Sequence, residues 1–134
     1  MNILMFLTPK NNVAYIEQKN TLRQALEHMD NSGFSAVPII DEKGCYINTI
    51  TEGDLLRYIK TNSFLDLKKA EKVLLVDVPV KKDIKPVNID RSINEVMLLV
   101  INQNFVPVID DEGRFIGIIT RKSMMTYFQK NLKF

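Results

Sequence analysis

The sequence has 134 residues, of which 46% are hydrophobic and 25% charged, with a formal net charge of +2. This length fits one compact domain, or two half-sized units that share a core, because independent domains run to roughly 100–150 residues. The ordinary apolar content argues against a disordered chain, and the small net charge gives no general attraction to nucleic acid.

The chain has one cysteine, Cys45, and one histidine, His28. A single cysteine cannot form an intrachain disulfide, and a lone thiol fits a reduced cytoplasmic compartment. His28 falls on a predicted helix among charged residues, so we expect neither a Cys/His catalytic pair nor a metal site. The N-terminal apolar run from Ile3 to Leu7 is too short for a signal-peptide core or a membrane span, which needs about 20 residues. We therefore expect a soluble, cytoplasmic protein that is not an enzyme and does not bind a membrane.

One segment occurs twice in this chain. The sequence Val-Pro-Ile-Ile-Asp-Glu-Lys-Gly at residues 37–44 returns as Val-Pro-Val-Ile-Asp-Asp-Glu-Gly at residues 106–113. A threonine follows the proline by thirteen positions in both copies, Thr51 in the first and Thr120 in the second. A repeated unit that is too small to bury its own apolar face packs against its twin. We therefore expect two similar halves with equivalent clefts between them.

Each copy is predicted to begin with a short extended segment, at residues 13–16 and 86–89, followed by a helix. Thr21 with Gln24, and Ser92 with Glu95, have the spacing of a capping box. Behind each cap, apolar residues recur at the spacing of a helix face that lies in the core. These core residues are Leu22, Ala25, Leu26 and Met29 in the first copy and Ile93, Val96, Met97 and Val100 in the second.

Two strands joined by a tight turn are predicted after each helix, because β-branched runs flank turns whose glycine takes a positive φ. The predicted strands are residues 36–40 and 46–51 in the first copy and 105–109 and 115–120 in the second. Beyond Thr51 and Thr120 the apolar period becomes helical again, so each threonine lies where a strand gives way to a helix. Residues 60–80, between the copies, are predicted to form a partly helical connector.

This pattern resembles the tandem cystathionine-β-synthase (CBS) domain, also called the Bateman module. The hairpin hydrophobic-Pro-hydrophobic-hydrophobic-Asp-x-x-Gly, followed by hydrophobic-Thr-x-x-Asp, is that family's pattern, and it covers about residues 12–128. The resemblance implies an α/β (α+β) fold in which two β-α-β-β-α motifs pack through their sheets with pseudo-two-fold symmetry. We place motif 1 at residues 1–63, a connector at 64–80 and motif 2 at 81–134.

More narrowly, the chain resembles stand-alone bacterial CBS-pair proteins that act as receptors for cyclic di-AMP. The segments that carry this resemblance are Asn12-Val13-Ala14, Gly33-Phe34-Ser35-Ala36 and Gly117-Ile118-Ile119-Thr120-Arg121-Lys122. The resemblance implies clefts for an adenine nucleotide and a flat, disc-like homodimer. Because no enzyme, transporter or channel domain is expected on the chain, its signal is expected to pass to a separate target protein.

The main predicted cleft combines residues of both copies. Phe34 offers an aromatic face for a base, where stacking contributes roughly 1–3 kcal/mol, and backbone groups at Val13, Ala14 and Ser35 are placed to read the adenine edge. Thr120, Arg121 and Lys122 begin the last helix, where N–H groups, a hydroxyl and two cations favour a phosphate. Alternatively, both cations are solvated surface charges. The predicted residues of this cleft are Asn12, Val13, Ala14, Phe34, Ser35, Ala36, Thr120, Arg121 and Lys122.

Differences between the copies predict unequal clefts. Thr51 and Asp54 mark the second predicted cleft, since the aspartate of the family's Thr-x-x-Asp pattern accepts hydrogen bonds from ribose hydroxyls. Ser123 stands at the equivalent place in the second copy and lacks that charge. Asp54 has a structural alternative as an acidic residue at a helix start. Asn48 stands where the second copy has Gly117, a position at which glycine permits the close approach of a ligand or backbone.

The leading hypothesis is a regulatory module without catalysis that binds cyclic di-AMP, AMP, ADP or ATP and signals by shifting its dimer arrangement. The alternative is a constitutive interaction or assembly subunit whose clefts are filled by its own side chains. Catalysis lacks a general base beside a nucleophile, and nucleic-acid binding lacks an aromatic and basic stripe. The sequence does not distinguish among the adenine nucleotides.

Overall fold

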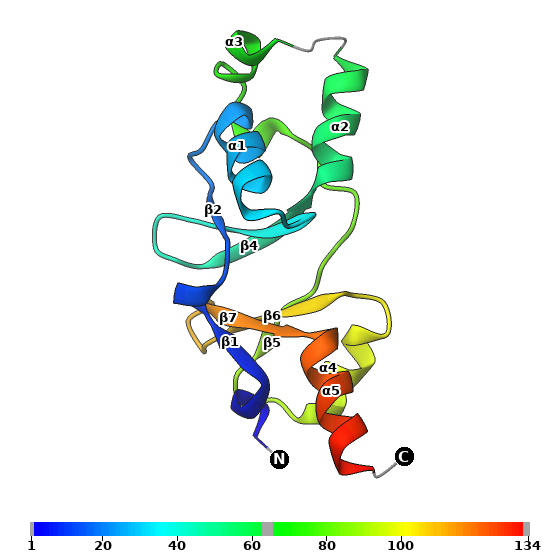
Figure 1. The fold of residues 1–134 in the computed structure, drawn as a ribbon. Coiled ribbons are helices and arrows are strands. Elements are labelled where there is room, and N and C mark those ends of the chain that lie inside the picture. The colour runs from blue at the N-terminus through cyan, green and yellow to red at the C-terminus, as the bar shows by residue number, and fades with distance from the viewer. Residues whose placement is uncertain (1, 63–65, 133–134) are drawn as a thin grey trace. The chain divides into compact units, whose positions relative to one another are not determined.

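The computed structural model describes residues 2–62 and 66–132, which form two compact units (Figure 1). The central unit consists of residues 14–83, and the terminal unit joins the chain up to Val13 to the chain from Ile84 onward. The sequence had suggested that the first residues belong to motif 1. In the structure they pack instead with the second copy of the repeat.

The central unit is built on a three-stranded mixed sheet in the order β2-β3-β4. Its strands are β2 (Ile16–Glu17), β3 (Ala36–Ile40) and β4 (Tyr46–Thr51), with β2 parallel and β4 antiparallel to β3. The helices α1 (Leu22–Ser32) and α2 (Glu52–Thr61) lie on the same side of this sheet (Figure 1). The chain continues through α3 (Leu67–Ala70) and the 3-10 turn η3 (Leu75–Asp77).

The terminal unit repeats this arrangement and adds one strand, giving the order β1-β7-β6-β5. The strands are β1 (Leu7–Pro9), β5 (Val87–Asn88), β6 (Phe105–Ile109) and β7 (Phe115–Thr120). The helices are α4 (Ile93–Val100) and α5 (Arg121–Asn131), and the 3-10 turns η1 (Ile3–Phe6) and η2 (Lys10–Asn12) flank β1. The two units confirm the predicted α/β fold, which over residues 2–62 and 66–132 has two mixed sheets and five α-helices.

The hairpin strands occupy the predicted residues in both copies, whereas the strands that open the copies are shorter than predicted. The opening strand of the first copy pairs with β3 through Ile16 and Glu17 alone, and that of the second copy pairs with β6 through Val87 and Asn88 alone. The N–H of Val13 closes a 3-10 turn on the carbonyl of Lys10 (3.1 Å), so the chain there is not extended into a strand.

One of the two predicted capping boxes is present. The Thr21 hydroxyl accepts the Gln24 N–H (3.2 Å), and Gln24 Oε1 accepts the Thr21 N–H (2.8 Å). The Ser92–Glu95 box is wrong, because the Ser92 side chain makes no capping bond. The Glu95 N–H binds the Ser92 carbonyl instead (3.1 Å), and the Ser92 backbone forms an isolated bridge with Asn2. A tight first turn therefore replaces the side-chain cap of α4.

The predicted connector contributes to the core of the central unit. Ala70, Leu75 and Val78 are buried in the same cluster as the apolar faces of α1 and α2. The expected helical character is present as α3 and η3, while residues 63–65 of this connector lie outside the described residues. Leaving water stabilises such apolar side chains by roughly 1.5–3 kcal/mol each, so the connector is a structural part of its unit.

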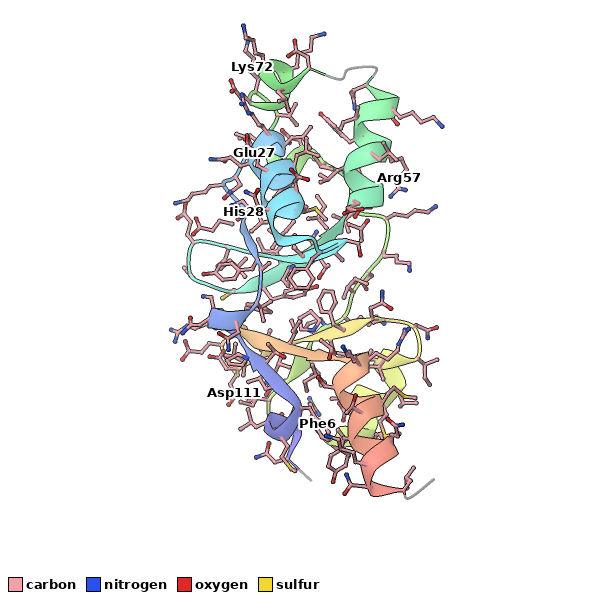
Figure 2. All side chains as sticks on the ribbon, viewed as in Figure 1. Phe6, Glu27, His28, Arg57, Lys72 and Asp111 are labelled. Carbon is pink, nitrogen blue, oxygen red and sulfur yellow. The ribbon has the colours of Figure 1, made fainter. Side chains whose placement is uncertain are left out.

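The N-terminal segment completes the terminal unit. Ile3 and Phe6 are buried in its core, and the Phe6 ring (labelled in Figure 2) meets Tyr127 edge to face at 4.9 Å. β1 pairs antiparallel with β7, with Pro9 opposite Gly117. Gly117 has a φ of 155°, and a Cβ there would lie 2.2 Å from the Thr8 carbonyl oxygen. The glycine is thus needed for the approach of a neighbouring backbone.

Among residues 2–62 and 66–132, no helix combines the length and apolar character that crossing a membrane requires.

Candidate functional site

The structure brings together predicted site residues of the central unit at the start of α2. Ala36 pairs with Thr51 across β3 and β4, and the Glu52 N–H donates to the Ser35 carbonyl (2.9 Å). Thr51 caps α2 by accepting the Asp54 N–H (3.1 Å). Ser35 and Ala36 had been predicted for the main cleft and Thr51 and Asp54 for the second one. Within this unit they form a single group.

Phe34 lies on the loop beside this group. It follows Gly33, which ends α1 in the left-handed conformation with a φ of 73°. The Phe34 N–H donates to the Ser32 hydroxyl (3.3 Å), while the ring is 55% exposed. Single exposed apolar side chains are ordinary on protein surfaces. An exposed aromatic ring next to backbone groups at a helix start nevertheless has the chemistry of a stacking platform for a base.

The Asp54 side chain accepts hydrogen bonds from three groups of the protein. Its carboxylate is buried and accepts the Thr51 N–H at Oδ2 (2.9 Å), which completes a second capping box that the sequence had not indicated. Its Oδ1 accepts Arg57 Nη2 (2.7 Å) and the Lys81 N–H (3.1 Å), and Figure 2 labels Arg57 on α2. A carboxylate has about four lone-pair sites, so a ribose hydroxyl at Asp54 meets an acceptor with three protein donors.

The segment Asn12-Val13-Ala14 passes from one unit to the other. Asn12 ends η2 with an exposed side chain, Val13 closes the terminal unit, and Ala14 begins the central unit. The Val13 N–H is bound to the Lys10 carbonyl (3.1 Å) and is therefore not available to an adenine edge.

The start of α5 holds the predicted phosphate residues in the terminal unit. The Thr120 hydroxyl accepts the Ser123 N–H (3.0 Å) and shares a hydrogen bond with the Ser123 hydroxyl (2.7 Å). The Arg121 N–H donates to the Asn104 carbonyl (2.9 Å). Two of the first three N–H groups of α5 therefore have protein partners, which leaves the Lys122 N–H facing the helix start. The predicted cluster of unpaired N–H groups is smaller than expected.

The two cations at this helix start differ in their surroundings. Arg121 Nε donates to the Val100 carbonyl (2.7 Å), so the guanidinium is drawn to the C-terminal end of α4, where a cation is favoured. The Lys122 side chain is exposed and, among the residues that the structure describes, has no ion-pair partner. Lys122 is therefore the cation that is available to an external anion, while Arg121 ties α5 to α4.

An apolar groove lies between α4 and α5 and has a volume of about 720 Å³. Its lining residues are Asn94, Met97, Leu98, Val100, Ile101, Arg121, Met124, Met125 and Phe128. The sequence had assigned Met97 to the core, but its side chain is 40% exposed, and Leu98, Ile101 and Met125 are between 64% and 69% exposed. The sequence does contain a signal for this exposed apolar surface. The residues of α4 are apolar around most of the helix circumference, which indicates that more than one face of the helix is buried.

A second, smaller pocket of about 140 Å³ lies in the central unit beside Asn48. Its other lining residues are Gln18, Ile39, Ile47, Leu75, Val76, Val78 and Val80. Within the described part of the chain, the buried Oδ1 of Asn48 has no hydrogen-bond partner. Asn48 and Gly117 both lie on the return strand of a hairpin, where Asn48 pairs with Ile39 and Gly117 with Val108, but Gly117 also pairs with Pro9 of β1.

Tyr46, which begins β4, has a shifted acidity. Burial of the phenol raises its pKa to about 12, and the negative charge of Asp83 acts in the same direction, against the effect of its hydrogen bond with the Thr49 hydroxyl (2.7 Å). Tyr46 therefore stays neutral throughout the physiological pH range.

Over residues 2–62 and 66–132, no three His, Cys, Asp or Glu side chains are grouped to hold a metal ion.

Comparison with known proteins gives the same two repeats. The model of the CBS domain family matches residues 6–61 and 75–130. Among characterised sequences, the chain is 26% identical over 128 residues to Cyclic di-AMP receptor B of Bacillus subtilis (strain 168), covering 96% of this chain and 86% of the relative.

Two solved structures share the fold across almost the whole chain. CbpB in complex with c-di-AMP is 28% identical, with a TM-score of 0.87 and coverage of 98% of this chain and 87% of that one. A CBS domain protein from Streptococcus pneumoniae TIGR4 is also 28% identical, with a TM-score of 0.86 and coverage of 98% and 88%.

Proposed function

Since the chain belongs to the CBS-domain family and carries a tandem pair of these domains, we propose that it is a regulatory module that binds an adenine nucleotide, cyclic di-AMP foremost. In this proposal the protein catalyses no reaction and passes its signal to a separate partner protein. The likeness to a c-di-AMP complex over nearly the full chain supports the choice of this nucleotide over AMP, ADP and ATP.

The observation that carries the proposal is the surface at the start of α2. There the exposed ring of Phe34 lies beside Ser35, whose carbonyl is bound to the first N–H of α2. The ring supplies a stacking face, and neighbouring backbone groups supply hydrogen bonds to an adenine edge. Lys122 in the terminal unit supplies a cation for a phosphate, next to a helix N-terminus that favours negative charge.

Replacing Phe34 with alanine tests this proposal. Base stacking on an aromatic ring contributes roughly 1–3 kcal/mol to the binding free energy. Without it the Kd for cyclic di-AMP should rise roughly 5- to 150-fold. Phe34→Tyr keeps the aromatic face and should bind as the wild type does. Because Phe34 is 55% exposed, neither substitution should lower the melting temperature much. The Kd values of the two variants, measured by calorimetric titration, can therefore be compared directly. An unchanged Kd in Phe34→Ala would remove the stacking site from the proposal.

We further propose that the protein is a homodimer whose contact includes the apolar groove between α4 and α5. Exposed apolar patches of this kind are typical of protein interfaces. A single charge placed there should oppose association, because an unpaired charge is costly to bury. Leu98→Asp should therefore raise the dimer dissociation constant at least tenfold in sedimentation equilibrium. Leu56→Asp on α2 is a matched control, since Leu56 and Leu98 are both 67% exposed. Equal dissociation of the two variants, or a monomeric wild type, would contradict the proposal.

A constitutive assembly subunit is the competing function, and one observation favours it. The Asp54 carboxylate and the Thr120 and Ser123 hydroxyls are satisfied by groups of the protein itself. Such internal pairing is what the alternative requires of clefts filled by their own side chains. The two hypotheses differ in the effect of charge reversal at Lys122.

A further inference from the structure

Asp54 holds two parts of the central unit that are far apart in the sequence. Two of its donors, Thr51 and Arg57, lie within three residues of it on the same helix start. The third is the backbone N–H of Lys81, 27 residues later, which donates to Oδ1 at 3.1 Å. Lys81 lies beyond η3 in a segment without regular structure. The carboxylate therefore fastens the chain just before it leaves the central unit.

The same segment is fastened a second time four residues later. Gln103, whose side chain is only 6% exposed, accepts the Lys85 N–H at Oε1 (2.9 Å) and donates Nε2 to the Lys85 carbonyl (3.1 Å). Lys85 belongs to the terminal unit and Lys81 to the central unit. Residues 82–84, which join the two units, are thus held at one end by Asp54 and at the other by Gln103.

A ribose diol at Asp54 requires more acceptor sites than the carboxylate has left. Three of about four lone-pair sites already have donors, and the buried carboxylate leaves little room for another arrangement. Thr51 is held by the reciprocal capping box, and Arg57 by its charge. The Lys81 N–H is a neutral donor and makes the longest of the three bonds. Because Lys81 is exposed, water can hydrate its N–H once the bond is lost. The Lys81 N–H is the donor that yields most readily.

We propose that a nucleotide ribose at Asp54 displaces the Lys81 N–H and so releases the segment that continues from Lys81 through residues 82–84. This inference rests on the proposed nucleotide-binding function and adds its means of transmission. Occupation of the site removes the bond from the Lys81 N–H to Asp54, while the hydrogen bonds between Lys85 and Gln103 stay. Binding energy at Asp54 is thereby coupled to the order of this segment, which a partner protein can sense.

Hydrogen exchange at single amides of the ¹⁵N-labelled full chain tests this inference. With saturating AMP, the Lys81 amide should exchange at least tenfold faster than in the ligand-free protein, whereas the Thr51 amide should keep its rate. The control ligand is 2′,3′-dideoxyadenosine monophosphate, which lacks both ribose hydroxyls and should leave the Lys81 rate unchanged. If AMP binds and the Lys81 rate stays the same, the coupling is refuted while nucleotide binding stands. Absence of AMP binding would refute this inference alone, because the proposed function is tested separately by titration with cyclic di-AMP.

A pair of variants gives an independent readout. Lys81→Pro removes the N–H, so AMP no longer competes with it, and affinity for AMP should rise about fivefold over Lys81→Ala. Both variants lack the ammonium group, so their comparison isolates the backbone donor. Equal affinities would overturn the inference. If Lys81→Pro does not fold, the exchange rate of the wild-type Lys81 amide with and without AMP still tests the inference.

Discussion

Replacing Gly117 with alanine should lower the free energy of unfolding by about 3 kcal/mol and loosen β1 from β7. The new Cβ would lie 2.2 Å from the Thr8 carbonyl oxygen and 2.9 Å from Leu7 Cδ1, and a φ of 155° is unfavourable for any side chain. Backbone cannot move aside as a flexible side chain can, so strand pairing should be lost together with part of the burial of Ile3 and Phe6. Urea denaturation monitored by circular dichroism measures this loss.

Gly113→Ala is the control for this experiment. Gly113 also has a positive φ, of 82°, but a Cβ there would meet nothing within 4 Å. This variant therefore carries the conformational cost alone and should lose about 1 kcal/mol. Similar losses in both variants would show that close packing of β1 is not what requires glycine at position 117. Since Asn12 ends η2 and residues 13 and 14 directly follow it, Gly117→Ala should also weaken nucleotide binding.

Reversing the charge of Lys122 should reduce the affinity for cyclic di-AMP at least tenfold. Hydrogen bonds between charged groups contribute roughly 1.5–3 kcal/mol, and a glutamate at this place also repels the phosphate. Lys122 is exposed, so Lys122→Glu should fold normally. Arg121→Glu is a less direct test, because it also removes the hydrogen bond to the Val100 carbonyl.

Lys130→Glu provides the matched control, since it makes the same charge change near the other end of α5. Its affinity for cyclic di-AMP should stay within about twofold of the wild type, because its charge lies about two turns, or roughly 12 Å, from Lys122, which exceeds the Debye length at physiological salt. Calorimetric titrations of both variants give the comparison. If the two variants bind equally well, Lys122 makes no phosphate contact, and the constitutive assembly subunit becomes the better account.

The hairpins and their following helices could be predicted from the sequence because each signal is local and occurs twice. β-branched runs on either side of Asp-x-x-Gly specify residues 36–40 and 46–51, and the same pattern specifies 105–109 and 115–120. Thr51 and Thr120 cap helices in the structure as the change of period predicted. Repetition distinguished these patterns from accidental matches.

The N-terminal segment could not be assigned in the same way, because the strand with which it pairs lies more than a hundred residues away. β1 has only three residues and pairs with β7. In the structure a 3-10 turn also precedes the extended segment of each copy, and the residue before each turn forms a bridge to a helix cap. These bridges join Asn2 to Ser92 and Leu74 to Thr21. Short 3-10 turns have no strong sequence signal, so this part of the repeat was missed.

The candidate site was predictable in its residues and less so in their partners. The pattern located Phe34 and Thr51, which the structure brings to one place through the pairing of Ala36 with Thr51. The bond from Lys81 to Asp54, and the bond from Arg121 to the Val100 carbonyl, depend on how distant segments fold back. No spacing along the chain encodes them. These contacts assign structural roles to two residues that the family pattern associates with a ligand.

The central claim is that this chain binds an adenine nucleotide, and calorimetric titration of the wild type tests it most directly. Protein stripped of any co-purified nucleotide should be titrated side by side with cyclic di-AMP, AMP, ADP and ATP. We expect saturable binding of cyclic di-AMP with a micromolar or lower Kd, tighter than that of the three mononucleotides. No heat of binding for any of the four below millimolar concentration would contradict the account.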